Sequence, residues 1–313
     1  MRLAINGWFA GQETTGSGQY LHHLLAHLPR QRSDIEVDVL VPATTYDPTW
    51  QELWPALHFH VLGLPPLPRQ LQKVWWEQVG FPRAARRRNA DVLWVPYWAA
   101  PLWHPAPVVV TVHDVIPLIL PEYRGGFQNR IYTWLVSQTA RRAKSILTVS
   151  HASADAIVRA LGIPAQRVHV VYHGPSASPE PPNNSDDMEA IRAKYGLPDR
   201  YFLYLGGFDV RKNVVSVVRA YQRFLELGGQ NEDLVIAGAL PRTSGGVLVD
   251  PREIVAECHM ENRVHFCGWV DEADKPVLYA LATAFVFPSV YEGFGMMATE
   301  AMASGTPVIA GAP

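Results

Sequence analysis

Two glutamates near the end of the chain stand in a pattern that could bind a ligand with hydroxyl groups. Glu292 lies in a turn, and Glu300 follows it by eight residues in a run rich in Ala, Met and Glu. A carboxylate can accept two hydrogen bonds from a vicinal diol, the group that sugars and riboses offer. The pair therefore indicates a sugar or nucleoside site. The spacing also leaves open that Glu292 only complements a helix dipole and that Glu300 lies on a solvated face.

The segments around these glutamates predict a strand, a glycine turn and a helix in succession. Ala284–Phe287 is an apolar run typical of a buried parallel strand. The turn carries Gly293, Phe294 and Gly295, and glycine permits φ > 0 and close approach of a ligand to the backbone. Met296–Ser304 favours a helix, whose free N–H groups and positive dipole end attract an anion. A nucleotide sugar fits this combination better than a bare phosphate.

Two adjacent cations follow a similar strand and glycine turn. Tyr201–Leu205 predicts a strand, Gly207 lies in the turn, and Arg211 and Lys212 come next. Arginine offers phosphate a planar fork and lysine a point charge. Together they would offset the charge of a diphosphate, including the charge that develops on a departing nucleoside diphosphate. The alternative is a solvated basic pair on a loop.

The first half of the chain carries two weaker signals. Gly16 and Gly18 form a turn after the first predicted strand, but the third glycine of the dinucleotide fingerprint is missing. His113 and Asp114 follow another apolar strand, at the end where open α/β sheets bind ligands. A neutral imidazole can hydrogen-bond a sugar hydroxyl, and Asp114 can fix its tautomer. The alternative is a histidine that satisfies backbone groups at a strand end.

Apolar strand-like runs alternate with helical patterns along the whole chain. This alternation predicts an α/β fold with parallel sheets and right-handed crossovers. A stretch rich in Pro, Ser and Asn starts at residue 175 and reads as a linker. We therefore expect an N-terminal Rossmann-like domain over 1–174, a linker with a lead-in helix over 175–198, and a C-terminal Rossmann-like domain over 199–313.

The glutamate motif resembles a known signature. Glu-Gly-Phe-Gly at 292–295, Glu300, and Ala-Met-Ala-x-Gly-x-Pro-Val at 301–308 are similar to the donor site of the retaining glycosyltransferases of family four. The turn at 16–20, the His113–Asp114 pair, the linker and the Arg-Lys-Asn motif at 211–213 follow in the order of that family. Two positions depart from it: Met297 stands where proline is frequent, and Phe208 where arginine is frequent.

The resemblance implies roles for individual residues. The first glutamate and the turn amides face the donor sugar, the second glutamate holds the ribose hydroxyls, and the histidine–aspartate pair faces the donor sugar. The implied catalytic residues are His113, Asp114, Arg211, Lys212 and Glu292. The implied donor-binding residues are Gly16, Gly18, Gly207, Arg211, Lys212, Glu292, Gly293, Phe294, Gly295 and Glu300.

The resemblance also implies a fold and a reaction. The fold is GT-B, with two Rossmann-like domains whose parallel sheets face a cleft. The reaction moves a hexose, mannose or glucose, from a nucleotide-diphosphate sugar to a glycan or lipid-linked acceptor, with retention and without a metal or other cofactor. The chain stops at Pro313, before the final strand and helix of the family, so we expect an incomplete second domain. A non-catalytic nucleotide-sugar-binding protein, a truncated inactive homologue and a hydrolysing epimerase of the same fold stay open.

Composition narrows the class of partner. The net charge of −2 gives no reason to expect nucleic acid, and two cysteines do not make a disulfide scaffold. The chain begins without a signal peptide and has no apolar run approaching the ~20 residues that span a bilayer. We expect a cytoplasmic protein, with the inner face of the membrane as an alternative location.

One segment favours the alternative location at the membrane. Trp75 and Trp76 precede a basic cluster, and aromatic residues beside cations could hold the protein on an anionic membrane. Against this, Leu71, Val74, Trp75 and Val79 fall at helical spacing within a helix expected over 70–79 and would pack as a core face. The basic residues, which would then form a solvated face, are Arg83, Arg86, Arg87 and Arg88.

Overall fold

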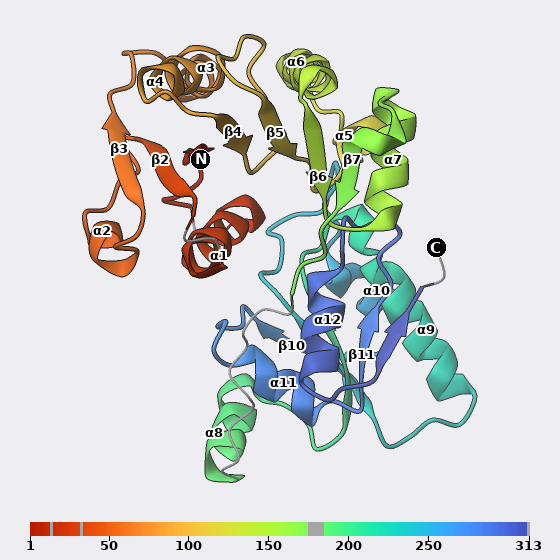
Figure 1. Ribbon diagram of the computed structural model, residues 1–313. Coiled ribbons are helices and arrows are strands. Elements are labelled where there is room, and N and C mark those ends of the chain that lie inside the picture. The colour runs from red at the N-terminus through yellow and green to blue at the C-terminus, as the bar shows by residue number, and fades with distance from the viewer. Residues whose placement is uncertain (13–14, 32–33, 175–184, 312–313) are drawn as a thin grey trace. The chain divides into compact units, whose positions relative to one another are not determined.

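The computed structural model describes residues 1–12, 15–31, 34–174 and 185–311 (Figure 1). The chain divides into two compact units, Met1–Tyr172 and His173–Pro313. Of the predicted linker and lead-in helix over 175–198, residues 175–184 lie outside the described residues. The helix α8 (Ser185–Tyr195) follows them.

Unit 1 contains a parallel sheet of seven strands in the order β3-β2-β1-β4-β5-β6-β7. Parallel strands are buried on both faces, which explains apolar runs such as the Val-Val-Val-Thr of β5. The strands are β1 (Arg2–Asn6), β2 (Glu36–Pro42), β3 (His58–Leu62), β4 (Val92–Val95), β5 (Val108–Thr111), β6 (Ser145–Thr148) and β7 (Val168–Val170).

Helices cover both faces of this sheet, as doubly wound folds require. Figure 1 shows α1 on one side of the sheet and α3, α4 and α6 on the other. The α-helices of unit 1 are α1 (Gly16–Gln31), α2 (Thr49–Leu53), α3 (Arg69–Trp75), α4 (Phe81–Arg87), α5 (Ile116–Ile119), α6 (Phe127–Arg142) and α7 (His151–Leu161). The order β1-α1-β2 and the parallel register confirm the predicted α/β class.

The helix expected over 70–79 is part of a longer helical stretch. A π-helical segment, η1 (Trp76–Gly80), joins α3 to α4, and such insertions often occur near functional sites. The core face also differs from the prediction, because Leu71 is 54% exposed whereas Trp76 is fully buried. Trp76 donates its indole N–H to Asn6 Oδ1 at 2.9 Å at the end of β1, so a polar contact selects the buried residue.

Unit 2 contains a parallel sheet of five strands in the order β10-β9-β8-β11-β12. The strands are β8 (Tyr201–Leu205), β9 (Asp233–Ala237), β10 (Val264–Gly268), β11 (Ala284–Phe287) and β12 (Val308–Ala310). Besides α8, its helices are η4 (Val210–Lys212), α9 (Val214–Glu226), α10 (Pro251–Glu257), α11 (Lys275–Leu281) and α12 (Met296–Ala303).

Two apolar clusters hold this second sheet. One packs Tyr279 of α11 and Ala301 of α12 against one face, and the other packs Val218 of α9 and Ile254 of α10 against the opposite face. Phe208, the residue that departs from the family pattern, is 3% exposed and contacts Tyr204 with ring centroids 6.0 Å apart. A buried aromatic side chain thus occupies a position where the family frequently has a cation.

Candidate active site

The turn after β8 and the turn after β11 meet through ion pairs. Arg211 Nη1 lies 2.6 Å from Glu292 Oε2, and Lys212 Nζ lies 2.6 Å from Glu292 Oε1. All three side chains are largely buried, with exposed fractions between 13% and 20%. Arg211 Nε also lies 3.5 Å from Asp209 Oδ1. Residues eighty positions apart in sequence therefore form one charged cluster, with both cations already neutralised by carboxylates.

Backbone contacts fix the two turns to each other. Arg211 donates from Nη1 to the carbonyl of Tyr291 at 3.0 Å, and its own carbonyl accepts the N–H of Val290 at 2.9 Å. Asn213 adopts a left-handed conformation (φ +55°) at the start of α9 and donates from Nδ2 to the carbonyl of Pro288 at 3.3 Å. Arg211 and Lys212 therefore lie on a loop that these contacts hold in place, which argues against the alternative of a solvated basic pair.

Glycine is required where the second turn enters α12. Gly295 has φ +91°, and a Cβ there would lie 3.2 Å from the ring of Phe287. The first backbone N–H groups of a helix have no intrahelical partner, so this end of α12 can bind an anion. Phe294 contacts His173 edge-on at 5.3 Å. We interpreted His173 as the exit of a strand, and no local pattern indicated this contact.

Glu300 does not lie on a solvated face, so that alternative was wrong. It is 7% exposed, and the hydroxyl of Tyr279 donates to Oε2 at 3.2 Å. Burial raises the pKa of Tyr279, and the negative charge of Glu300 raises it further. A tyrosine hydroxyl also contacts the glycine turn after β8, where Tyr204 donates to the carbonyl of Gly207 at 2.6 Å. Neither tyrosine was among the predicted site residues.

Unit 1 places its predicted residues at the carboxyl edge of its own sheet. A Cβ on Gly18 would lie 1.9 Å from the carbonyl oxygen of Gln12, so only glycine fits, whereas Gly16 has open space. The helix that starts here carries Tyr20, whose ring meets the imidazole of His113 edge-on at 4.8 Å. Burial raises the pKa of Tyr20, and a hydrogen bond with Thr111 partly offsets this. The glycine turn and the histidine are therefore neighbours.

The backbone of Pro96 is one hydrogen-bond partner of His113. Burial lowers its pKa, which favours the neutral imidazole, and a hydrogen bond to the backbone of Pro96 acts in the opposite direction. Proline has no N–H, so the imidazole donates to the carbonyl of Pro96, and this contact can fix the tautomer. Asp114 accepts the backbone N–H of Ile116 at 3.1 Å at the start of α5. The carbonyl of Pro96 thus holds the imidazole, and a role of Asp114 in fixing the tautomer stays a prediction.

No group of three or more His, Cys, Asp or Glu side chains in the described part of the chain is placed to hold a metal ion. Among the described helices, none has the length and apolarity needed to cross a bilayer.

Comparison with known proteins decides the family. The family model described as Glycosyltransferase Family 4 matches residues 14–177, which is more than half of the chain. The chain belongs to glycosyltransferase family 4. A second model, Glycosyl transferases group 1, matches residues 187–313 of this family 4 chain. The identification rests on these matches and agrees with the order of motifs in the sequence.

Individual relatives share part of this family 4 chain. O-antigen chain mannosyltransferase B of Escherichia coli is 32% identical over 202 residues, which cover 64% of this chain and 52% of the relative. The chain thus spans about half the length of that curated relative.

Solved structures confirm the predicted GT-B fold. Sucrose-phosphate synthase from Thermosynechococcus elongatus has a TM-score of 0.68 at 23% identity, covering 99% of this chain and 81% of the other. Anabaena HepE, solved with UDP-glucose, has a TM-score of 0.64 at 18% identity, covering 99% of this chain and 80% of the other. At these identities the likeness concerns the fold alone.

Proposed function

We propose that this family 4 chain transfers a hexose from a nucleotide-diphosphate sugar to a glycan or lipid-linked acceptor, with retention of anomeric configuration and without a metal. The observation that carries the proposal is the cluster of Arg211, Lys212 and Glu292 beside the glycine entry to α12. Mannose is the first sugar to test, because the E. coli relative is named a mannosyltransferase, and glucose is the second, because HepE was solved with UDP-glucose.

The charged cluster supports binding of a diphosphate. Guanidinium and ammonium groups bind phosphate oxygens well, and in a largely buried site their charge is screened less than in water. As the glycosidic bond breaks, negative charge grows on the departing nucleoside diphosphate. Arg211, Lys212 and the amides at the start of α12 would stabilise that charge. In this proposal the cations do the work that a bound Mg²⁺ does in other transferases.

The carboxylates support binding of hydroxyl groups. When phosphate oxygens approach Arg211 and Lys212, the carboxylate of Glu292 can exchange a cation contact for a hydroxyl of the donor sugar. Glu300 is held by Tyr279 and keeps lone pairs that could accept ribose hydroxyls. Residues Gly207, Gly293 and Phe294 would complete the donor site through their backbone.

The residues of unit 1 support a role in which an uncharged side chain hydrogen-bonds the substrate. His113, with a lowered pKa, is an uncharged imidazole at pH 7 and can hydrogen-bond a sugar hydroxyl. Gly16 and Gly18 would line the approach to the donor phosphates and the acceptor, and we place Asp114 there as a supporting residue. We propose no covalent nucleophile, so the acceptor would attack on the face from which the diphosphate departs and give its proton to a donor phosphate oxygen.

Calorimetric titration tests the donor site. The chain is titrated with GDP-mannose, UDP-glucose and ADP-glucose, together with Lys212→Ala and Glu300→Gln. Lys194→Ala is the matched control, because Lys194 also contacts two carboxylates, Asp271 at 2.8 Å and Asp274 at 2.7 Å, but lies away from the glycine turns. We expect one donor to bind, both site variants to weaken it at least tenfold, and the control to change it less than twofold.

Product analysis then separates the reaction from its alternatives. A new glycoside with retained configuration, formed equally fast in the presence of EDTA, supports metal-independent transfer. Binding without any product indicates a nucleotide-sugar-binding protein or an inactive homologue, and an altered free sugar indicates an epimerase. Equal donor affinity in Lys212→Ala and Lys194→Ala would contradict the proposed site.

A further inference from the structure

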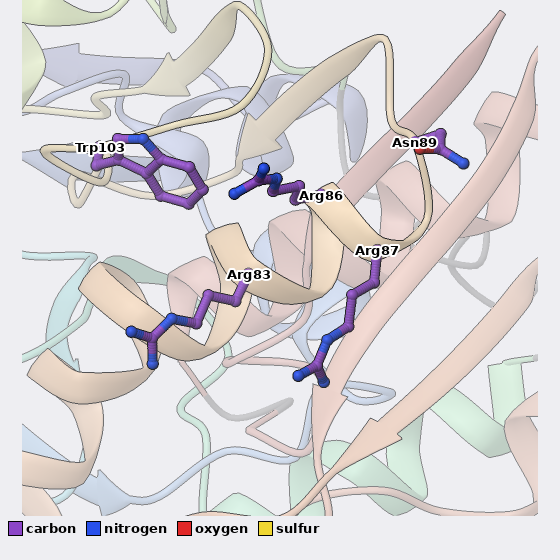
Figure 2. A pocket seen from close by; sticks show the side chains of 5 residues that line it. All are labelled: Arg83, Arg86, Arg87, Asn89 and Trp103. Atoms are coloured by element: carbon purple, nitrogen blue, oxygen red, sulfur yellow. The ribbon is translucent and has the colours of Figure 1, made fainter.

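A basic hollow lies at the amino edge of the sheet in unit 1. Arg83, Arg86, Arg87, Asn89 and Trp103 line it, and its volume is about 650 Å³ (Figure 2). The first three residues belong to α4, which leads into the amino end of β4, and Trp103 lies in the segment that leads into the amino end of β5. The glycine turn and His113 follow the carboxyl ends of β1 and β5, so the hollow is at the opposite edge of the sheet.

The arginines of the hollow carry uncompensated charge. The side chains of Arg83, Arg86 and Arg87 are exposed. Within the described residues, none of the three lies within 4.0 Å of a carboxylate. Three acids of the neighbouring strands and turn have other partners. Asp38 pairs with Arg2, Arg88 and His60, Glu36 pairs with Arg2, and Asp91 accepts the backbone N–H of Arg2 at 2.7 Å.

Helix capping does not account for these arginines. Basic residues often occupy the last turn of a helix, where they satisfy free carbonyls and oppose the dipole. At this helix end Arg2 performs that task, since its Nη1 donates to the carbonyl of Arg88 at 2.8 Å. Asn89 then turns the chain with φ +53°. The three arginines of the hollow therefore place three positive charges within five residues, and no carbonyl at this helix end depends on them for the contact that Arg2 makes.

Trp103 adds an apolar wall to the hollow. Its side chain is 48% exposed, and the guanidinium carbon of Arg86 lies 5.9 Å from the ring centroid. Figure 2 shows these two side chains pointing toward one another. Stacking on an indole orients a guanidinium and leaves its N–H groups available to an anion. Large exposed aromatic side chains beside cations are typical of binding surfaces.

We infer that this hollow binds a phosphate or diphosphate group, with the part of the ligand that bears it lying against Trp103. Guanidinium forks match pairs of phosphate oxygens, and several arginines at one place favour phosphate over a single carboxylate. This inference is independent of the proposed donor site, because it concerns the other unit and a different set of residues. The phosphate could come from a soluble phosphorylated molecule or from a lipid headgroup, and the experiment separates the two.

The test compares two pairs of arginines. Arg86→Gln with Arg87→Gln removes two charges from the hollow. The matched control is Arg142→Gln with Arg159→Gln, which removes two exposed arginines from the last turns of α6 and α7. Each chain is titrated with pyrophosphate in 50 mM NaCl, in a background carrying Arg211→Gln and Lys212→Gln, so that unit 2 contributes little. Trp103→Phe is a third variant that keeps the charge, and circular dichroism verifies folding.

We expect pyrophosphate to bind about tenfold more weakly to the Arg86/Arg87 variant and less than twofold more weakly to the control. Sedimentation with vesicles of phosphatidylglycerol and phosphatidylcholine identifies the source. Loss of both pyrophosphate and vesicle binding supports a lipid headgroup, whereas loss of pyrophosphate binding alone supports a soluble ligand. Equal affinity of the two double variants for pyrophosphate would overturn the inference, whether or not the donor site in unit 2 is real.

Discussion

The carboxyl edges of the two sheets are built from different chemistry. In unit 2, Asp209, Arg211, Lys212 and Glu292 form a largely buried cluster of ion pairs between two glycine turns. In unit 1, the corresponding edge holds Tyr20 and His113 in ring contact, with uncharged side chains at neutral pH. The difference teaches that the carboxyl edge of unit 2 holds cations that can balance an anion, whereas the ring pair at the carboxyl edge of unit 1 can hydrogen-bond a neutral group.

The two edges also differ in how their groups are held in place. The unit 2 cations are fixed by carboxylates that a ligand must partly displace, so binding there exchanges one set of charge contacts for another. The imidazole in unit 1 is fixed by a backbone carbonyl and an aromatic edge, which a ligand need not disturb. We therefore expect substitutions in unit 2 to change affinity for the diphosphate, and substitutions in unit 1 to change stability and protonation.

The largest expected effect is on affinity for a nucleoside diphosphate, which should depend on the cations of the unit 2 edge and not on the imidazole of the unit 1 edge. Arg211→Gln together with Lys212→Gln should weaken binding of the preferred nucleoside diphosphate about a hundredfold, since two charge-assisted contacts are lost. His113→Gln should weaken it less than threefold. Calorimetry on both variants measures the contrast, and a similar loss in each would show that the comparison is wrong.

The next effect concerns the glycine turn of unit 1. Gly18→Ala should destabilise the chain by about 2 kcal/mol, because the new Cβ would lie 1.9 Å from the carbonyl oxygen of Gln12 and the backbone must move. Gly16→Ala, two residues earlier, meets no atom within 4 Å and should change stability by less than about 0.5 kcal/mol. Urea unfolding compares the two, and equal midpoints would contradict the close contact.

A smaller effect should distinguish binding of the donor sugar from binding of the phosphates in unit 2. Glu292→Gln removes the carboxylate from both cations, which lie 2.6 Å from it. Affinity for the nucleoside diphosphate should then stay equal or rise, whereas affinity for the nucleotide sugar should fall about tenfold, since a charged acceptor for sugar hydroxyls is lost. Titration with both ligands gives the ratio. An equal loss of affinity for the two ligands would instead show that Glu292 stabilises the loop and does not bind the sugar.

The smallest effect concerns protonation in unit 1. The folded pKa of His113 is lowered by burial, so below about pH 6.5 the unfolded chain takes up a proton that the folded chain resists. The contribution to stability is therefore complete above that pH and is lost as pH falls, at up to about 1.4 kcal/mol per pH unit. His113→Gln should reduce the loss of unfolding free energy between pH 7 and pH 5. An identical loss in variant and parent would show that the imidazole titrates normally.

Several features of this protein follow from the sequence alone. Alternating apolar runs and helical segments determine parallel α/β units, because local periodicity and turn residues act over a few positions only. The glycine turns and the run from Glu292 to Glu300 likewise revealed the donor-type motif. A local side-chain contact also precedes α7, because the hydroxyl of Ser150 accepts the N–H of Ser153 at 3.0 Å.

Only the tertiary structure decided which side chains meet. Nothing local to Arg211 indicates that Glu292 neutralises it, and nothing near Glu300 indicates Tyr279, because these partners lie on different elements. The buried face of the helix at 69–87 was also undetermined, since the polar contact of Trp76 with Asn6 selects it across 70 residues. Ion pairs and burial depend on distances that the sheet order sets, and the order of strands is not a local property of the sequence.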